Sequence, residues 1–122
     1  MLIEDSDAQR DGAPILHWFV YDLSAKVHTL PAGVPAGASL TEPVALMQGP
    51  NSAGQNAYRG PHPPQTSKGP HHYHVEVFAL DAVLPAVLDR PSLAKAMAGH
   101  VLAQGELVGL FTAPAPTTAP TS

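Results

Sequence analysis

The chain has 122 residues, the size of one domain, and hydrophobic residues make up 44% of it. Its 14 prolines and 10 glycines exclude a coiled coil or a helical bundle, because so many prolines would interrupt the helices. The formal net charge is −4 and the six basic residues are scattered, which excludes a nucleic-acid groove or an anionic membrane surface, since both need a basic cluster.

The absence of cysteine excludes disulfides, thiolate metal sites, cysteine nucleophiles and thiol redox chemistry. No apolar stretch approaches the length of a membrane span, and the N-terminal segment MLIEDSD has no features of a signal peptide. These observations predict a cytoplasmic protein.

The first half of the chain contains two strand candidates followed by a long irregular segment. Leu2–Glu4 is a short apolar start, and Ile15–Leu23 is rich in β-branched and aromatic residues, which indicates a buried strand. Residues 31–70 hold most of the prolines and glycines, with a short strand expected around Val44–Gln48. The turn-forming pairs in this segment favour ordered loops over a flexible linker.

The second half contains the clearest strand and the one predicted helix. His71–Leu80 alternates, so that His71 and Tyr73 fall on one face. A helix is predicted over Ser92–Gln104, with Asp89 as its N-terminal cap, Pro91 in its first turn and Gly105 at its C-terminal cap.

The chain is predicted to end in a strand over Leu107–Thr112, followed by a disordered tail over residues 113–122 that is rich in Pro, Thr and Ala. Residues 1–112 therefore form the predicted domain. Strands with one late helix indicate a mainly-β or α+β fold.

Seven histidines occur in this small chain, and three of them lie within His71–His74. In a strand, His72 and His74 share one face and offer two nitrogen ligands for zinc. Two further ligands would be required, and no cysteine or HExxH pattern supplies them. Ordinary strand histidines are the simpler interpretation.

Asp5 and Asp7 would project to the same side of an extended chain, as a pair of acid/base carboxylates or as a solvated strand end. Nucleophile signatures are lacking, because no G-x-S-x-G pattern is present and Ser52 has no local motif. Binding is thus better supported than catalysis.

Several motifs occur in an order that resembles the phosphatidylethanolamine-binding protein family, in particular its bacterial Raf-kinase-inhibitor-like branch. Residues 4–9 (EDSDAQ) resemble the family's D-P-D-A-P motif, and Leu16-His17-Trp18 resembles its H-W strand. Residues 93–103 and 106–109 resemble the last helix and the last strand. The remaining matches are Asn51, Gly54-Gln55, Tyr58, Gly60-Pro61, Pro63-Pro64, His71-His72-Tyr73 and Ala79-Leu80-Asp81.

The resemblance implies a β-sandwich with Greek-key character, a C-terminal helix and a small anion-binding pocket at one end. By matching position, the pocket residues are Asp5, Asp7, His17, Pro63, Pro64, His71 and Tyr73. Imidazole and phenol groups offer donors to phosphate or carboxylate oxygens, and Asp5 is placed to orient an imidazole. The implied ligand is a small anion or a phospholipid head group, without a cofactor.

The chain departs from the family pattern in three places. Ser6 and Gln9 replace the prolines of D-P-D-A-P, and His62 stands where bacterial members often have cysteine. The family's N-terminal region, including an S-P-P-L-x-W segment, is not found ahead of residue 4.

The predicted function is a small-anion or head-group binding protein that is not an enzyme and that modulates a partner kinase or protease. The alternatives are a hydrolase of small phosphate esters or esters that uses the Asp/His pocket, and a zinc module. A homodimer is expected, because an uncovered sheet edge and apolar face tend to pair.

Overall fold

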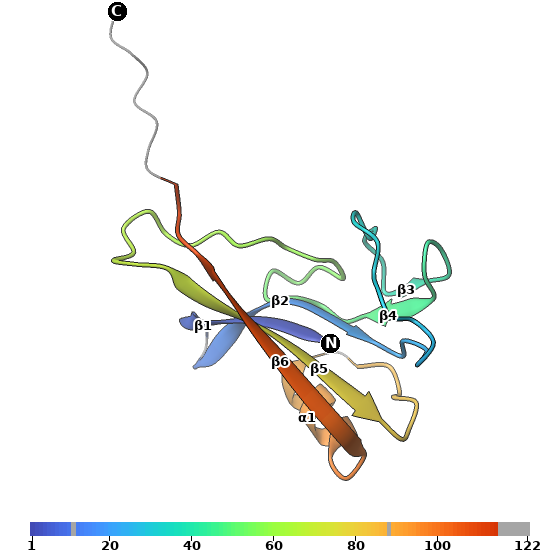
Figure 1. The fold of residues 1–122 in the computed structure, drawn as a ribbon. Coiled ribbons are helices and arrows are strands. Elements are labelled where there is room, and N and C mark those ends of the chain that lie inside the picture. Colours follow the sequence, from blue (N-terminus) through green and yellow to red (C-terminus); the bar gives the residue numbers. More distant parts are fainter. Residues whose placement is uncertain (11, 88, 115–122) are drawn as a thin grey trace, which may run out of the picture.

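A computed structural model describes residues 1–10, 12–87 and 89–114. Its strands form one six-stranded antiparallel sheet in the order β3-β4-β2-β1-β5-β6, accompanied by one short helix (Figure 1). The elements are β1 (Leu2–Arg10), β2 (Ala13–Tyr21), β3 (Ser39–Leu40), β4 (Leu46–Gln48), β5 (His71–Leu80), α1 (Arg90–Met97) and β6 (Val101–Phe111).

The mainly-β prediction is confirmed, and β5 has the bounds that its alternating pattern predicted. The first strand is longer than predicted, because β1 continues to Arg10 and forms a hairpin with β2. The second sheet of a sandwich is not confirmed, since the strands among the described residues belong to one sheet.

The helix predicted over Ser92–Gln104 is wrong in its second half. Asp89 caps the helix by accepting a hydrogen bond from the Ser92 backbone N–H at 2.8 Å, as predicted. The helix nevertheless ends at Met97, because Gly99 adopts a positive φ of 79° that an α-helix does not allow. Val101 and Leu102, which continued the apolar spacing of the predicted helix, therefore lie in a strand.

As a consequence, β6 begins at Val101 instead of the predicted Leu107. It pairs with β5 from Leu80↔Val101 to His71↔Phe111, and Gly105 lies within this ladder opposite Val77 instead of capping the helix. Most of the predicted disordered tail, residues 115–122, lies outside the described residues.

One face of the sheet packs against α1. Leu93 and Met97 of the helix are buried against Leu2 of β1 and against Phe19, which is 0% exposed, in β2. Burial of side chains of this size stabilises the fold by about 1.5–3 kcal/mol each. This cluster fastens α1 to the centre of the sheet.

The opposite face packs against the irregular segment before and after β3. Trp18, Val20 and Leu46 form its buried centre. The indole N–H of Trp18 donates to Gln48 Oε1 at 2.6 Å, and Gln48 Nε2 donates to the carbonyls of Pro35 and Gly37, both at 2.9 Å. The buried amide of Gln48 thus holds the irregular segment on the sheet.

Two interruptions of the β1–β2 ladder position side chains for the site. Ile3 pairs with Trp18 and Glu4 with Leu16, so His17 lies between them as an extra residue on β2. Further along, Asp5 pairs with Ile15 but Gln9 pairs with Pro14, so residues 6–8 have no partner on β2. Such bulges redirect side chains out of the regular alternation of a strand.

A loop after β4 runs beside β2 and is held by its own side chains. Asn51 Oδ1 accepts hydrogen bonds from the N–H groups of Ala53 and Gln55 at 2.9 and 3.1 Å, and Asn51 Nδ2 donates to the Ala57 carbonyl at 2.9 Å. The Ser52 N–H donates to the Leu16 carbonyl at 2.9 Å, so the loop is hydrogen-bonded to the strand. This ordered loop agrees with the prediction from its turn residues.

Within residues 1–10, 12–87 and 89–114, no helix is both long enough and apolar enough to cross a membrane.

We predict that Gly49→Ala destabilises the protein by about 1–3 kcal/mol, the range for overpacked cores. A Cβ at position 49 would overlap the ring of Phe19, which is fully buried and cannot move aside freely. Urea denaturation of both proteins measures the difference.

Gly105→Ala is the matched control, because an added Cβ in β6 meets no atom within 4 Å. This variant should be at least as stable as the wild type, since alanine restricts the unfolded chain. Equal stability of Gly49→Ala and the wild type would contradict the close packing at Phe19.

Candidate functional site

A cavity of about 340 Å³ lies between the sheet and the loop after β4. Six of the seven predicted pocket residues line it, and Asp7 does not. Its lining consists of Asp5, Ala8, Gln9, Ile15, Leu16, His17, Ser52, Ala53, Arg59, His62, Pro63, Pro64, His71 and Tyr73. The volume lies within the range of small-molecule sites, about 300–1,000 Å³.

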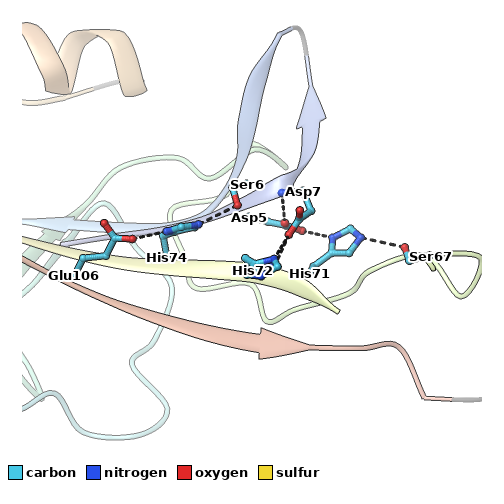
Figure 2. Close-up of polar contacts among 8 residues, drawn as sticks. All are labelled: Asp5, Ser6, Asp7, Ser67, His71, His72, His74 and Glu106. Carbon is cyan, nitrogen blue, oxygen red and sulfur yellow. Dashed lines mark hydrogen bonds and ion pairs between the residues drawn. The ribbon is translucent and has the colours of Figure 1, made fainter. Parts of the chain in front are cut away.

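The most buried polar contact at the cavity joins β1 to β5. Asp5 Oδ2 lies 2.6 Å from His71 Nδ1, and the two side chains are only 4% and 10% exposed. A carboxylate only accepts hydrogen bonds, so Nδ1 carries the proton. The other ring nitrogen, Nε2, lies 3.0 Å from Ser67 Oγ, and in the neutral ring it accepts the hydroxyl proton of Ser67 (Figure 2).

Tyr73 lies opposite Asp5 in the β1–β5 ladder and also lines the cavity. Its hydroxyl is buried and makes no hydrogen bond of standard geometry within the described residues, although the Asp5 carboxylate lies near enough to interact with it. Burial, together with the nearby Asp5 carboxylate, raises the pKa of Tyr73 to about 12. The phenol therefore keeps its proton at neutral pH and remains a hydrogen-bond donor.

His17, the bulged residue of β2, packs edge-on against the Tyr73 ring with a centroid distance of 5.3 Å. Its Nδ1 lies 2.8 Å from the Arg59 carbonyl oxygen, and the Arg59 N–H donates back to the His17 carbonyl at 3.0 Å. A carbonyl only accepts, so Nδ1 carries the proton of the neutral ring and Nε2 carries the lone pair.

Asp7 lies outside the cavity because residues 6–8 bulge from the ladder. Its Oδ2 accepts from the backbone N–H and from Nδ1 of His72, at 2.6 and 2.7 Å (Figure 2). These hydrogen bonds hold the pKa of Asp7 below its usual range. The Asp7 N–H donates to Asp5 Oδ1 at 2.9 Å, so Asp7 supports the position of Asp5 through its backbone.

His72 and His74, the predicted zinc pair, contact different carboxylates. His74 Nδ1 bonds to Glu106 of β6, and its Nε2 lies 2.9 Å from Ser6 Oγ (Figure 2). In the described part of the chain, no group of three or more His, Cys, Asp or Glu side chains could hold a metal ion.

Three residues at the site were missed in the sequence. Arg59 and His62 line the cavity, and Ser67 contacts His71. His62 lies between Gly60-Pro61 and Pro63-Pro64 of the recognised loop, which was a signal for it, whereas Arg59 and Ser67 lie in irregular chain without any motif.

The model of the family described as phosphatidylethanolamine-binding protein matches residues 1–112. The chain belongs to the phosphatidylethanolamine-binding protein family. The resemblance seen in the sequence motifs is thereby confirmed, with the match extending through the end of β6.

Members similar to this chain occur in archaea and bacteria. A UPF0098 protein of Pyrococcus horikoshii is 39% identical over 114 residues, covering 91% of this chain and 55% of its own length. One from Chlamydia muridarum is 35% identical, with coverage of 91% and 70%. The chain thus spans little more than half of the first of these relatives.

A solved structure supports the same fold. The crystal structure of a phosphatidylethanolamine-binding protein homolog from Chlamydia trachomatis superposes with a TM-score of 0.77 at 32% identity. The match covers 93% of this chain and 70% of the chlamydial chain.

We predict that the contact between His74 and Glu106 makes stability depend on pH. The hydrogen bond that His74 donates to the Glu106 carboxylate raises the pKa of His74 above the ordinary imidazole value. Because the folded state favours the protonated ring, this contribution is fully present below pH 6.5 and is lost as the pH rises through the raised pKa. Glu106→Gln should therefore lower stability more at about pH 5.5 than at about pH 9, which lie on either side of an ordinary imidazole pKa.

NMR titration of the imidazole should give a lower His74 pKa in Glu106→Gln than in the wild type. Glu42→Gln, at an exposed position before β4, is the control and should leave that pKa unchanged. The same His74 pKa in the wild type and Glu106→Gln would show that the contact has no effect.

Proposed function

We propose that the cavity binds a small oxyanion, either free phosphate or the phosphate of a phospholipid head group. The observation that carries this proposal is the Tyr73 hydroxyl, a buried donor in the cavity lining that makes no hydrogen bond of standard geometry within the described residues. An unsatisfied buried hydroxyl costs about 1–3 kcal/mol, which a bound acceptor would recover. The family description names a phospholipid whose head group contains such an acceptor.

His17 provides a second group that can bind an anion in the cavity. In the neutral ring, Nδ1 donates to the Arg59 carbonyl, so Nε2 has no proton to offer. Protonation converts Nε2 into a charged donor. The protonated ring therefore offers an anion a charged donor that the neutral ring lacks.

The negative charge of the Asp5 carboxylate repels an anion, but both carboxylate oxygens already accept hydrogen bonds. One oxygen accepts from His71 and the other from the Asp7 N–H. Arg59 and His62 also line the cavity and add cationic or protonatable groups. The remaining predicted residues, Pro63 and Pro64, supply an apolar rim.

His71 has partners at both ring nitrogens, Asp5 and Ser67. We therefore assign direct contact with the anion to Tyr73 and to protonated His17. His71 forms part of the cavity wall and, when it is protonated, contributes a positive charge. Modulation of a kinase or protease stays a prediction of the resemblance, and so does a cytoplasmic location.

We predict that Tyr73→Phe weakens phosphate binding about tenfold or more, because hydrogen bonds to charged groups contribute about 1.5–3 kcal/mol. Phosphate titrations of both proteins, followed by NMR at one fixed pH, measure the affinity.

Tyr58→Phe is the matched control, since Tyr58 is 49% exposed and packs on Trp18 outside the cavity lining. It should bind phosphate as the wild type does. If Tyr73→Phe keeps wild-type affinity, the oxyanion does not contact Tyr73 and the assignment fails.

We also propose that two copies of this chain pair through β6. Leu102, Leu107 and Leu110 are 69%, 72% and 62% exposed, and β6 is the edge strand of the described sheet. Leu107 pairs with Val75 and Leu110 with His72, so the apolar side chains occupy both faces of the strand. Exposed apolar edge strands tend to pair with another chain.

Light scattering should accordingly give a dimer, and Leu107→Lys should shift it toward monomer. Val83→Lys, at an 84% exposed apolar position outside β6, should leave the dimer intact. A wild-type chain that is monodisperse and monomeric would refute the pairing.

A further inference from the structure

We propose that Ser67, His71 and Asp5 act as the nucleophile, the general base and the carboxylate that orients the base, and that together they hydrolyse small carboxylic esters. This activity goes beyond anion binding, because it uses the side of His71 that faces Ser67. The three residues come from the loop before β5, from the start of β5 and from β1 (Figure 2).

The contacts have the order that such chemistry requires. Asp5 Oδ2 holds His71 Nδ1 at 2.6 Å, and His71 Nε2 lies 3.0 Å from Ser67 Oγ. Asp5 therefore fixes the tautomer in which Nε2 has a lone pair to accept the Ser67 proton. As whole residues, Asp5 and His71 are 3% and 8% exposed, so the base is held in place by the surrounding protein.

Ser67 itself is half-buried and fixed by a turn, since its N–H donates to the Pro64 carbonyl at 3.1 Å. A shallow hollow of about 270 Å³ lies beside it, lined by Asp7, Ser67, Lys68, Gly69, Pro70 and His71. A short acyl group can reach Oγ from this hollow. Lys68 and Asp7 both line this hollow, so a cation and a carboxylate border the space beside Ser67.

The reaction is an acyl transfer to serine followed by hydrolysis. Ser67 Oγ bonds to the ester carbonyl carbon while its proton moves to His71 Nε2. The C–O bond to the alcohol then breaks, and His71 returns the proton to the leaving oxygen. Water attacks the acyl-serine and gives a proton to His71, which passes it to Ser67 Oγ as the acid leaves.

The chain contains an internal control for this assignment. Ser6, His74 and Glu106 have the same sequence of contacts, with Ser6 Oγ at 2.9 Å from His74 Nε2. Ser6 is exposed, and neither Ser6 nor His74 lines the cavity or the hollow. Because Ser6 and His74 do not line either of these pockets, which could hold a substrate, their hydrogen bonds should give no comparable catalysis.

The experiment measures p-nitrophenyl acetate hydrolysis by the wild type, Ser67→Ala and Ser6→Ala, all with the full chain. We expect Ser67→Ala to lose about a hundredfold in rate, as for removal of a group in general-base chemistry, and Ser6→Ala to keep the wild-type rate. Diisopropyl fluorophosphate should add to Ser67, with loss of fluoride, as identified by mass spectrometry of peptides.

Phosphate titration of Ser67→Ala separates this activity from anion binding. Ser67 does not line the cavity, so binding should be retained while hydrolysis is lost. Equal hydrolysis by the wild type and Ser67→Ala, or a wild type that neither hydrolyses the ester nor is labelled at Ser67, would overturn the proposal whatever the phosphate result.

Discussion

The buried contact between Asp5 and His71 is the constraint on which the rest of the site depends. It joins β1 to β5 where their ladder ends and places a carboxylate and an imidazole at 2.6 Å with little exposure. Removing His71 would leave the Asp5 carboxylate buried without its main partner, which for a buried charge costs about 3–5 kcal/mol. The same contact fixes the tautomer of His71, which lines both the cavity and the hollow beside Ser67.

The site is built where the sheet departs from regular pairing. A regular β2 would alternate Leu16, His17 and Trp18 across the sheet, but the extra residue lets His17 reach the cavity while Leu16 and Trp18 pack in the two separate clusters. The wider interruption in β1 directs residues 6–8 away from β2, which carries Asp7 to His72. Gln48 and Asn51 then hold irregular chain against this sheet.

These departures also explain how far the sequence predicts the structure. His71–Leu80 alternates along its whole length, so its bounds and shared faces were predictable from periodicity. The helix was overextended because apolar spacing alone does not report the turn at Gly99. Motif order brought six residues to one cavity, yet periodicity cannot foresee a bulge, which is why Asp7 lies outside. Ser67 contacts His71 through a turn that no pattern marks.

The two histidines of the cavity differ in what binds their Nδ1. For His17 the partner is the neutral Arg59 carbonyl, and for His71 it is the Asp5 carboxylate. Both partners only accept, so both neutral rings carry a lone pair on Nε2. His17 lies in the cavity lining, whereas Nε2 of His71 already accepts from the Ser67 hydroxyl. The two rings therefore share one neutral tautomer, and the groups around Nε2, not the tautomer, distinguish one histidine from the other.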